Sequence, residues 1–228
     1  MNRYYKIDTR RLKFAELWRI SPGLGFLVGA AMKCLQIPLR VGMLVPWLDG
    51  LAVVTRGSLP ADVSQALDPV AGQWNALGFE RVFDYTVDLR NPRNRAFASA
   101  LLAKDGRALA QVMFAEVTTD QGVRRKVETN CLSRFEDGSW CGVSSGRKQM
   151  DGPPEFFAAY LPGRPPGELY ALLQRAVSAS SAGTPRVWRA QEVEALIVGI
   201  NNRAVEFNVQ RGVYVPAEAG EAAPPPIG

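Results

Sequence analysis

Residues 95–117 read RAFASALLAKDGRALAQVMFAEV, in which two alternating apolar runs flank Asp105-Gly106. An Asp-Gly pair between such runs predicts a β-hairpin, because a type I′ turn needs a positive φ at both central residues. A two-residue loop sets Phe97 opposite Phe114, and the same register sets an arginine opposite a glutamate. Both are favourable cross-strand pairs, so the register is consistent with itself.

Antiparallel strands are also expected on both sides of this hairpin. Residues 82–89 alternate before it, and residues 123–135 follow it after a polar turn at 119–122. A second pair, Asp137-Gly138, predicts a hairpin into residues 140–144. The pattern is that of a four- to five-stranded antiparallel sheet.

The three cysteines are expected to be free thiols. In a two-residue loop at the second hairpin, Phe135 faces Trp140. Cys131 then shares the face of Phe135 and Cys141 lies on the other face, so the two cannot form a disulfide. Cys34 completes an odd set without a C-x-x-C motif. Free thiols indicate a reducing compartment, and we expect a cytoplasmic protein at the inner face of the membrane.

Helices are expected before and after the strands. Apolar residues recur at spacings of four and three from Val63 to Leu77, and Gly78 is a natural C-terminal stop. Pro69 inside this pattern indicates either a kink or a second helix capped by Asp68. Two more helices are predicted after the strands, at residues 168–177 and 189–209.

The fold class is therefore α+β, with a four- to five-stranded antiparallel sheet flanked by helices before and after it. We expect three parts along the chain. Residues 1–57 form a basic, apolar leader segment, and residues 58–211 form the α+β domain. Residues 212–228, rich in Pro, Ala, Gly and Glu, are expected to be a disordered tail.

Composition excludes several classes of chemistry. The chain has 228 residues, of which 47% are hydrophobic and 21% charged, as in an ordinary globular protein. It has no histidine. Ser-His-Asp triads, Cys-His dyads, histidine metal ligands and histidine proton switches are therefore excluded.

The positive charge is concentrated at the N-terminus. Residues 1–50 hold eight of the 27 basic residues and three of the 22 acidic ones, so they account for the whole net charge of +5. Short basic runs at 124–126 and 147–148 lie in an otherwise neutral body, which is a poor electrostatic footprint for nucleic acid. We expect no nucleic-acid partner, and a membrane surface or a protein partner through residues 10–54.

The leader has two open interpretations. Residues 24–32, LGFLVGAAM, and residues 41–54 are apolar, but neither run is long enough for a membrane span. They either pack on the domain or lie on a membrane surface. Cations around Leu, Phe and Trp in residues 10–19 favour an interfacial helix. The membrane-surface candidates are Arg10, Arg11, Lys13, Trp18 and Arg19.

No cofactor or metal site is predicted. Gly23, Gly25 and Gly29 have a spacing one residue too long for a dinucleotide-binding loop, and no strand precedes them. Asp84 and Asp88 share one parity of a predicted strand, with Glu116 and Glu128 on neighbouring strands. Such carboxylates suit general acid/base chemistry, but they are also typical of the solvated face of a sheet.

Several phrases of the chain resemble a family of uncharacterised bacterial proteins. They are Leu77-Gly78-Phe79, the F-x-D-G-S phrase at 135–139, Ser144-Ser145-Gly146, Pro153-Pro154 and Glu168-Leu169. The resemblance covers about residues 60–209 and implies an α+β domain. Members often carry transmembrane helices, and the family has no known function, so the resemblance implies no functional residue.

Two functions remain open from the sequence. The first is a non-enzymatic binding or interaction module of unknown ligand, peripheral to a membrane. The alternative is a small histidine-free enzyme that uses strand carboxylates such as Asp84 and Asp88 as general acid and base. An exposed apolar patch within residues 12–54 would favour the module. A pocket that gathers strand carboxylates with shifted pKa values would favour the enzyme.

Overall fold

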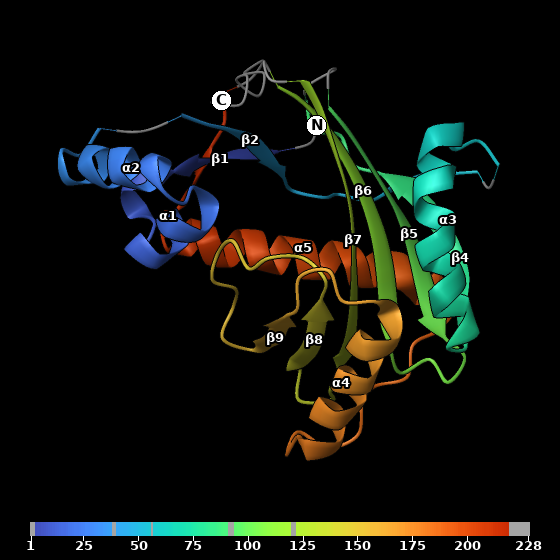
Figure 1. Ribbon diagram of the computed structural model, residues 1–228. Helices are drawn as coiled ribbons and strands as arrows, with labels where there is room; N and C mark the ends of the chain where they lie inside the picture. The colour runs from blue at the N-terminus through green and yellow to red at the C-terminus, as the bar shows by residue number, and fades with distance from the viewer. Residues whose placement is uncertain (1–2, 38–39, 56, 91–93, 120–121, 219–228) are drawn as a thin grey trace.

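The computed structural model describes residues 3–37, 40–55, 57–90, 94–119 and 122–218 (Figure 1). These residues form an α+β fold around a large mixed sheet. Its seven strands lie in chain order: β3 (Ala52–Val54), β4 (Phe79–Thr86), β5 (Arg95–Ala103), β6 (Leu109–Thr119), β7 (Gly122–Arg134), β8 (Trp140–Ser144) and β9 (Phe156–Tyr160).

The hairpin of β5 and β6 has the predicted register. Phe97 pairs with Phe114, and Arg95 pairs with Glu116. The turn itself differs from the prediction. Gly106 takes a positive φ of 71°, whereas Asp105 does not, so the turn is not of type I′. The register holds because the pairing of the apolar faces, rather than the turn type, fixes it.

The second hairpin is one residue out of the predicted register. Arg134, not Phe135, pairs with Trp140, because the loop has three residues and is closed by Phe135 N–H donating to Ser139 O at 2.9 Å. A shift of one residue reverses the face of every following side chain. Cys131 and Cys141 therefore lie in the same apolar cluster, contrary to the prediction, and both are nevertheless free thiols.

The sheet is wider than the predicted four or five strands. The predicted strands correspond to β4–β8, which are antiparallel, and β3 and β9 extend the two edges. β9 runs parallel to β8, so the sheet is mixed. Both edge strands are short, and neither has the alternating pattern that predicts a strand.

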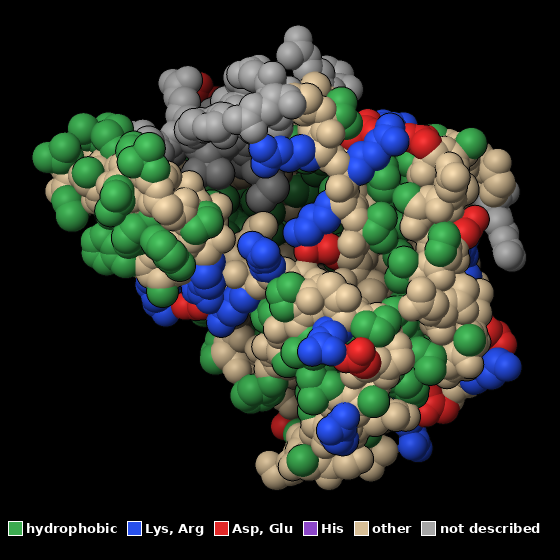
Figure 2. Space-filling model, in the orientation of Figure 1, with side chains coloured by type: hydrophobic (Ala, Val, Ile, Leu, Met, Phe, Trp, Pro, Cys, Tyr) green, Lys and Arg blue, Asp and Glu red, His purple; other side chains and the backbone are tan. Residues whose placement is uncertain are grey.

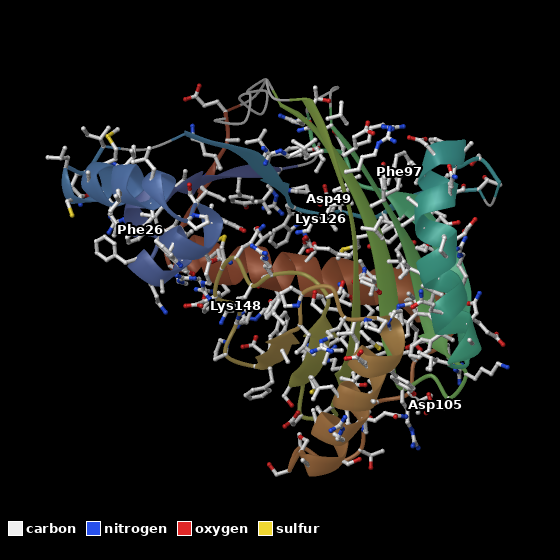
Figure 3. All side chains as sticks on the ribbon, in the orientation of Figure 1. Phe26, Asp49, Phe97, Asp105, Lys126 and Lys148 are labelled. Atoms are coloured by element: carbon white, nitrogen blue, oxygen red, sulfur yellow. The ribbon has the colours of Figure 1, made fainter. Side chains whose placement is uncertain are left out.

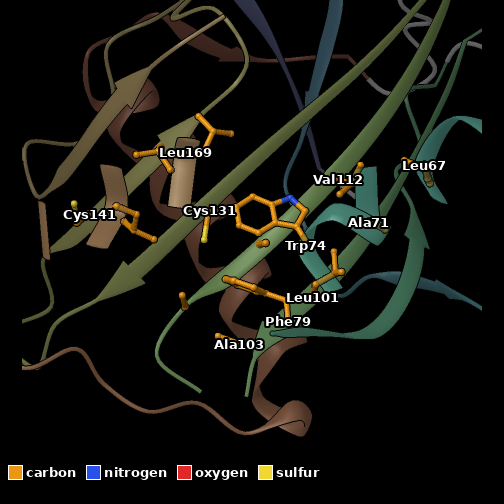
Figure 4. Close-up of a cluster of buried hydrophobic side chains, with 14 of the residues drawn as sticks. Leu67, Ala71, Trp74, Phe79, Leu101, Ala103, Val112, Cys131, Cys141 and Leu169 are labelled. Atoms are coloured by element: carbon orange, nitrogen blue, oxygen red, sulfur yellow. The ribbon is translucent and has the colours of Figure 1, made fainter. Parts of the chain in front are cut away.

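Three helices cover the two faces of this sheet (Figure 1). α3 (Ala61–Ala76) and α4 (Pro166–Ala179) pack on one face, and α5 (Val193–Gln210) packs on the other. Pro69 lies inside a single continuous α3, so neither a second helix nor an Asp68 cap forms. Trp74 is fully buried at the centre of the first cluster, and its indole Nε1–H donates to Thr129 Oγ1 at 2.7 Å (Figure 4).

The predicted leader and tail are both part of the fold. A three-stranded antiparallel sheet has β1 (Tyr4–Asp8) between β2 (Arg40–Pro46) and β10 (Tyr214–Pro216). Residues 214–216, assigned to the tail by composition, are thus a strand, while residues 219–228 lie outside the described part of the chain. Because β3 from the leader also joins the large sheet, no boundary at residue 57 separates a leader from a domain.

Two glycines provide a matched test of the first hairpin. Gly106 has a positive φ, and a Cβ there would lie 2.5 Å from Trp188 O. Gly78 has φ +88° with nothing within 4 Å of an added Cβ. We expect Gly78→Ala to cost about 1–2 kcal/mol for the left-handed backbone. Gly106→Ala should cost about 1–3 kcal/mol more, because Trp188 must move. Urea unfolding measures both, and equal losses would contradict the close packing of Trp188 on the turn.

Candidate functional site

Two short helices protrude beside the small sheet (Figure 1). They are α1 (Phe14–Ile20) and α2 (Leu24–Cys34), and a 3₁₀ turn at Thr9–Arg11 precedes them. Leu17 of α1 is buried and packs against α2 at Gly29, where an added Cβ would lie 3.1 Å from the leucine. The ring of Phe26 meets that of Trp18 edge-on, with centroids 5.1 Å apart. These contacts bury one side of each helix and leave the other side to solvent. We call α1, α2 and the residues up to Ile37 the helical lobe.

The outer surface of the helical lobe is apolar. Seven large apolar side chains between residues 14 and 37 are at least 42% exposed, and together they are nearly half of the fifteen most exposed in the described chain. They are Phe14, Trp18, Leu24, Leu27, Val28, Leu35 and Ile37. Figure 2 shows this apolar area covering the end of the molecule formed by α1 and α2. A gathered apolar surface of this kind marks an interaction site.

A buried carboxylate joins the helical lobe to the rest of the protein. Glu16 has no exposed surface, and Arg211 Nη2 donates to its Oε2 at 2.6 Å. The backbone N–H groups of Lys13 and Asp151 donate to the same carboxylate at 2.8 and 2.9 Å. Burial by itself raises the pKa of Glu16, but these three hydrogen bonds outweigh it and leave the pKa below the ordinary value.

Three cations converge on Asp151, next to that carboxylate. Lys13 Nζ lies 2.8 Å from Asp151 Oδ2, and Arg19 Nη2 lies 2.9 Å from its Oδ1. Lys148 Nζ is 3.2 Å from the same Oδ1. Hydrogen bonds from Lys13 and Arg19 hold the pKa of Asp151 far below its usual range. One carboxylate cannot neutralise three cations, so the inner edge of the helical lobe carries excess positive charge.

The predicted membrane-surface residues fall in two groups. Trp18 is 52% exposed within the apolar surface, and Arg11 is exposed. Lys13 and Arg19 lie at the Asp151 cluster, and Arg10 is paired with Asp8 at 2.8 Å. The structure thus brings Lys13, at the N-cap of α1, together with Arg19 at Asp151, while Trp18 lies on the outer apolar surface and Arg10 is paired one turn earlier.

Lys33 belongs to the same surface and was not among the predicted residues. Its Nζ lies 5.5 Å from the centroid of the Phe14 ring and donates to the carbonyl of Arg10. The lysine therefore adds a positive charge beside an exposed aromatic ring. The spacing of Phe14 and Lys33 along the chain gives no signal of this contact.

The strand carboxylates of the alternative function have separate partners. Asp84 is 2% exposed on the face covered by α3, and Ser99 Oγ donates to it at 2.5 Å. Asp88 lies beyond the end of β4, where Tyr4 of the small sheet donates to it at 2.9 Å. Asp88 lines a shallow cavity whose lining does not include Asp84. The two carboxylates therefore have different partners and different surroundings.

Two cations of the basic run at 124–126 are held in ion pairs, Arg125 with Glu116 and Lys126 with Glu128. Arg95 and Arg125 donate to Glu116 at 2.9 and 2.7 Å, and they lower its pKa. Lys126 pairs with Glu128 at 2.5 Å. These cations are part of ion pairs on the sheet surface.

No helix in the described chain is long and apolar enough to cross a bilayer. Among those same residues, no group of three or more Cys, Asp or Glu side chains is arranged to hold a metal ion. Comparisons with protein-family models, with curated proteins and with solved structures each found no match. The resemblance to an uncharacterised bacterial family therefore remains a prediction.

Glu16 gives a prediction with a defined pH dependence. Its pKa is lower in the folded protein than in the unfolded chain, so its ionised form stabilises the fold above about pH 4.5. That contribution is lost as the pH falls through the folded-state pKa. Glu16→Gln should therefore cost about 3 kcal/mol at neutral pH, where it leaves Arg211 without a counter-charge.

The difference between Glu16→Gln and the wild type should shrink in acid, because a protonated glutamate resembles glutamine. Denaturant unfolding at pH 7 and at acid pH measures it. Glu80→Gln is the control, since Glu80 is 74% exposed and should change stability little at either pH. A loss for Glu16→Gln that stayed constant with pH would refute the role given to the ionised carboxylate.

Proposed function

We propose that this protein is a non-enzymatic binding module that docks on the surface of an anionic membrane through the helical lobe, at the inner face of that membrane. The observation that carries the proposal is the set of seven exposed apolar side chains on one protruding pair of helices. A basic cluster borders them at Lys13, Arg19 and Lys148.

The apolar side chains fit insertion into the interface between head groups and acyl chains. Leu24, Leu27 and Leu35 are 63–76% exposed, so most of their surface is still available for burial. Full burial of a leucine side chain contributes about 1.5–3 kcal/mol. Trp18, at 52% exposure, is the residue type that favours the head-group level. With 11 residues, α2 suits a position along the surface.

The charge favours an anionic membrane over a neutral one. Each Lys or Arg near an anionic surface contributes about 1 kcal/mol, and residues 1–50 carry the whole net charge of the protein. Lys33 beside Phe14 and the Asp151 cluster place cations next to the apolar surface. An apolar centre with a cationic edge matches acyl chains below phosphate groups better than it matches a typical protein surface.

The alternative of a histidine-free enzyme has less support. Ser99 donates to Asp84 within the large sheet, whereas Tyr4 of the small sheet donates to Asp88 beyond the end of β4. The enzyme hypothesis stays a prediction, and the function proposed above rests on the apolar surface.

Two exposed apolar residues give a matched test of membrane docking. Leu27 is 63% exposed on α2, and Val123 is 57% exposed on β7, away from the helical lobe. Leu27→Glu should lower partitioning onto phosphatidylglycerol vesicles by more than about tenfold, because it removes apolar burial and adds a repelled charge. Val123→Glu should leave partitioning unchanged. Vesicle sedimentation at several lipid concentrations measures both.

Vesicle sedimentation can also contradict the proposal of membrane docking. Partitioning should fall with rising salt and should be weak on phosphatidylcholine vesicles. Wild-type protein that stays in the supernatant with phosphatidylglycerol, or an equal loss in both variants, would overturn the proposal. Point variants are needed, because a truncation at Ser58 would also remove β1, β2 and β3 from the two sheets.

A further inference from the structure

A hollow lies between the helical lobe and the large sheet. Figure 2 shows it with Lys and Arg side chains along its edge, and Figure 3 places Lys126 and Lys148 in this region. The cavity has a volume of about 470 Å³, within the range of about 300–1,000 Å³ typical of small-molecule sites. Its walls come from α1, the small sheet, the loop at 146–153, the α5 side of β8 and β9, and α5 itself.

A second cavity of about 180 Å³ lies beside it, between the sheet edge and α5. This smaller cavity is nearly all apolar, with Leu132 and Trp140 in its lining. The two cavities share five lining residues: Ser144, Phe156, Ala158, Tyr160 and Ile200. We call the two together the lobe cleft. An elongated molecule would have its apolar body in the smaller cavity and its end in the larger one, whose charged edge we call the mouth of the cleft.

Asn130 lines the smaller cavity, and one of its side-chain atoms is buried without a partner. Asn130 Oδ1 is buried, and no donor among the described residues reaches it. Asn130 pairs across the sheet with Ser144, so it lies at the point where the two cavities meet the strands. An unsatisfied buried carbonyl is costly, and native proteins leave few of them. A hydrogen-bond donor on a bound molecule would satisfy it once the amide of Asn130 turns toward the cavity.

The mouth of the cleft carries positive charge. Arg147 is exposed and pairs with no described residue, and Lys148 shares Asp151 with two other cations. The other wall is balanced, because Glu128 is paired with Lys126. Glu128 also packs against Gly146, where an added Cβ would lie 2.5 Å from its Oε1, so this carboxylate is held against the wall. The charge at the mouth favours an anion.

We propose that the lobe cleft binds a small anionic amphiphile, with its anionic group at Arg147 and Lys148, its apolar body between β9 and α5, and a hydrogen-bond donor at Asn130. This site shares Lys148 with the basic border of the helical lobe, but its cavity and Arg147 are not part of that surface, so the proposal does not depend on membrane docking. Its ligand is either a lipid taken from the membrane or a free amphiphile of the same chemistry.

The first test is a fluorescence titration of the full chain with anilinonaphthalenesulfonate, which joins an apolar ring system to one anionic group. Ala158→Phe fills the shared part of the cleft and should abolish saturable binding. Arg147→Glu leaves the cavity open and should weaken binding by at least about tenfold, whereas Lys104→Glu, on the distant 105–106 hairpin, should not. Circular dichroism checks that each variant is folded.

The helical lobe is a competing place for the probe, and Leu27→Glu tests it. Saturable binding that survives in Leu27→Glu and disappears in Ala158→Phe supports the cleft, whatever the vesicle assay shows. Binding lost in Leu27→Glu and kept in Ala158→Phe, or unchanged by Arg147→Glu, would overturn the proposal.

The contact at Asn130 has its own test. Straight-chain carboxylates of increasing length, each with and without a terminal hydroxyl group, compete with the probe. At the chain length that places the terminal hydroxyl group at Asn130, the hydroxylated carboxylate should bind wild type at least as tightly as the plain carboxylate. In Asn130→Leu the plain carboxylate should bind more tightly than the hydroxylated one. Equal discrimination in both proteins would refute the contact.

A final arm decides the source of the ligand. The protein is incubated with phosphatidylglycerol vesicles and separated from them, and bound lipid is measured by mass spectrometry. Lipid on wild type but not on Ala158→Phe assigns the site to a membrane lipid. Displacement of the probe by soluble carboxylates without lipid uptake assigns it to a free amphiphile.

Discussion

The carboxylate of Glu16 joins three parts of the chain that would otherwise have little reason to meet. It accepts hydrogen bonds from the start of α1, from the loop at Asp151 and from Arg211 after α5. The apolar cluster beneath the helical lobe is small, with Ile7, Leu12, Leu17 and Val213 as its buried members. A buried charge is costly unless it is paired and hydrogen-bonded, and here it is both. The orientation of the helical lobe therefore depends on an ionic contact more than on a large apolar core.

This arrangement divides the molecule into two kinds of structure. The large sheet between α3, α4 and α5 is held by two extensive apolar clusters. The helical lobe turns most of its apolar surface outward and is attached through charges. The proposed docking surface is on the outer side of this attachment and the proposed binding cleft on its inner side, and both include cations of the Asp151 cluster. A substitution in the Asp151 cluster should therefore alter both proposed sites.

Local patterns predicted the centre of the fold and missed its edges. The pairing of Phe97 with Phe114 follows from alternation alone, because one face of each strand must be buried. The same Asp-Gly pair at residues 137–138 lies in a three-residue loop rather than the predicted two-residue loop. That difference of one residue made the prediction place Cys141 on the wrong face of the sheet. The sequence showed the apolar run at residues 24–32, but it left open whether that run packs on the domain or stays exposed. Two of the partners of Glu16 left no sign in the sequence, since Asp151 and Arg211 lie 135 and 195 residues away and no local pattern encodes them.

The separation between Glu16 and Arg211 also orders events during synthesis. Translation delivers α1 and α2 first, but their ionic anchor and the strand β10 beside β1 are made 195 residues or more after Glu16. Until then the two helices have only part of their contacts with the rest of the fold, since Asp151 is made 135 residues after Glu16. A nascent chain in this state would present a hydrophobic N-terminal segment to chaperones or to a nearby bilayer before its sheet exists. The synthesis of Arg211 and β10 would then determine when the helical lobe takes its native orientation.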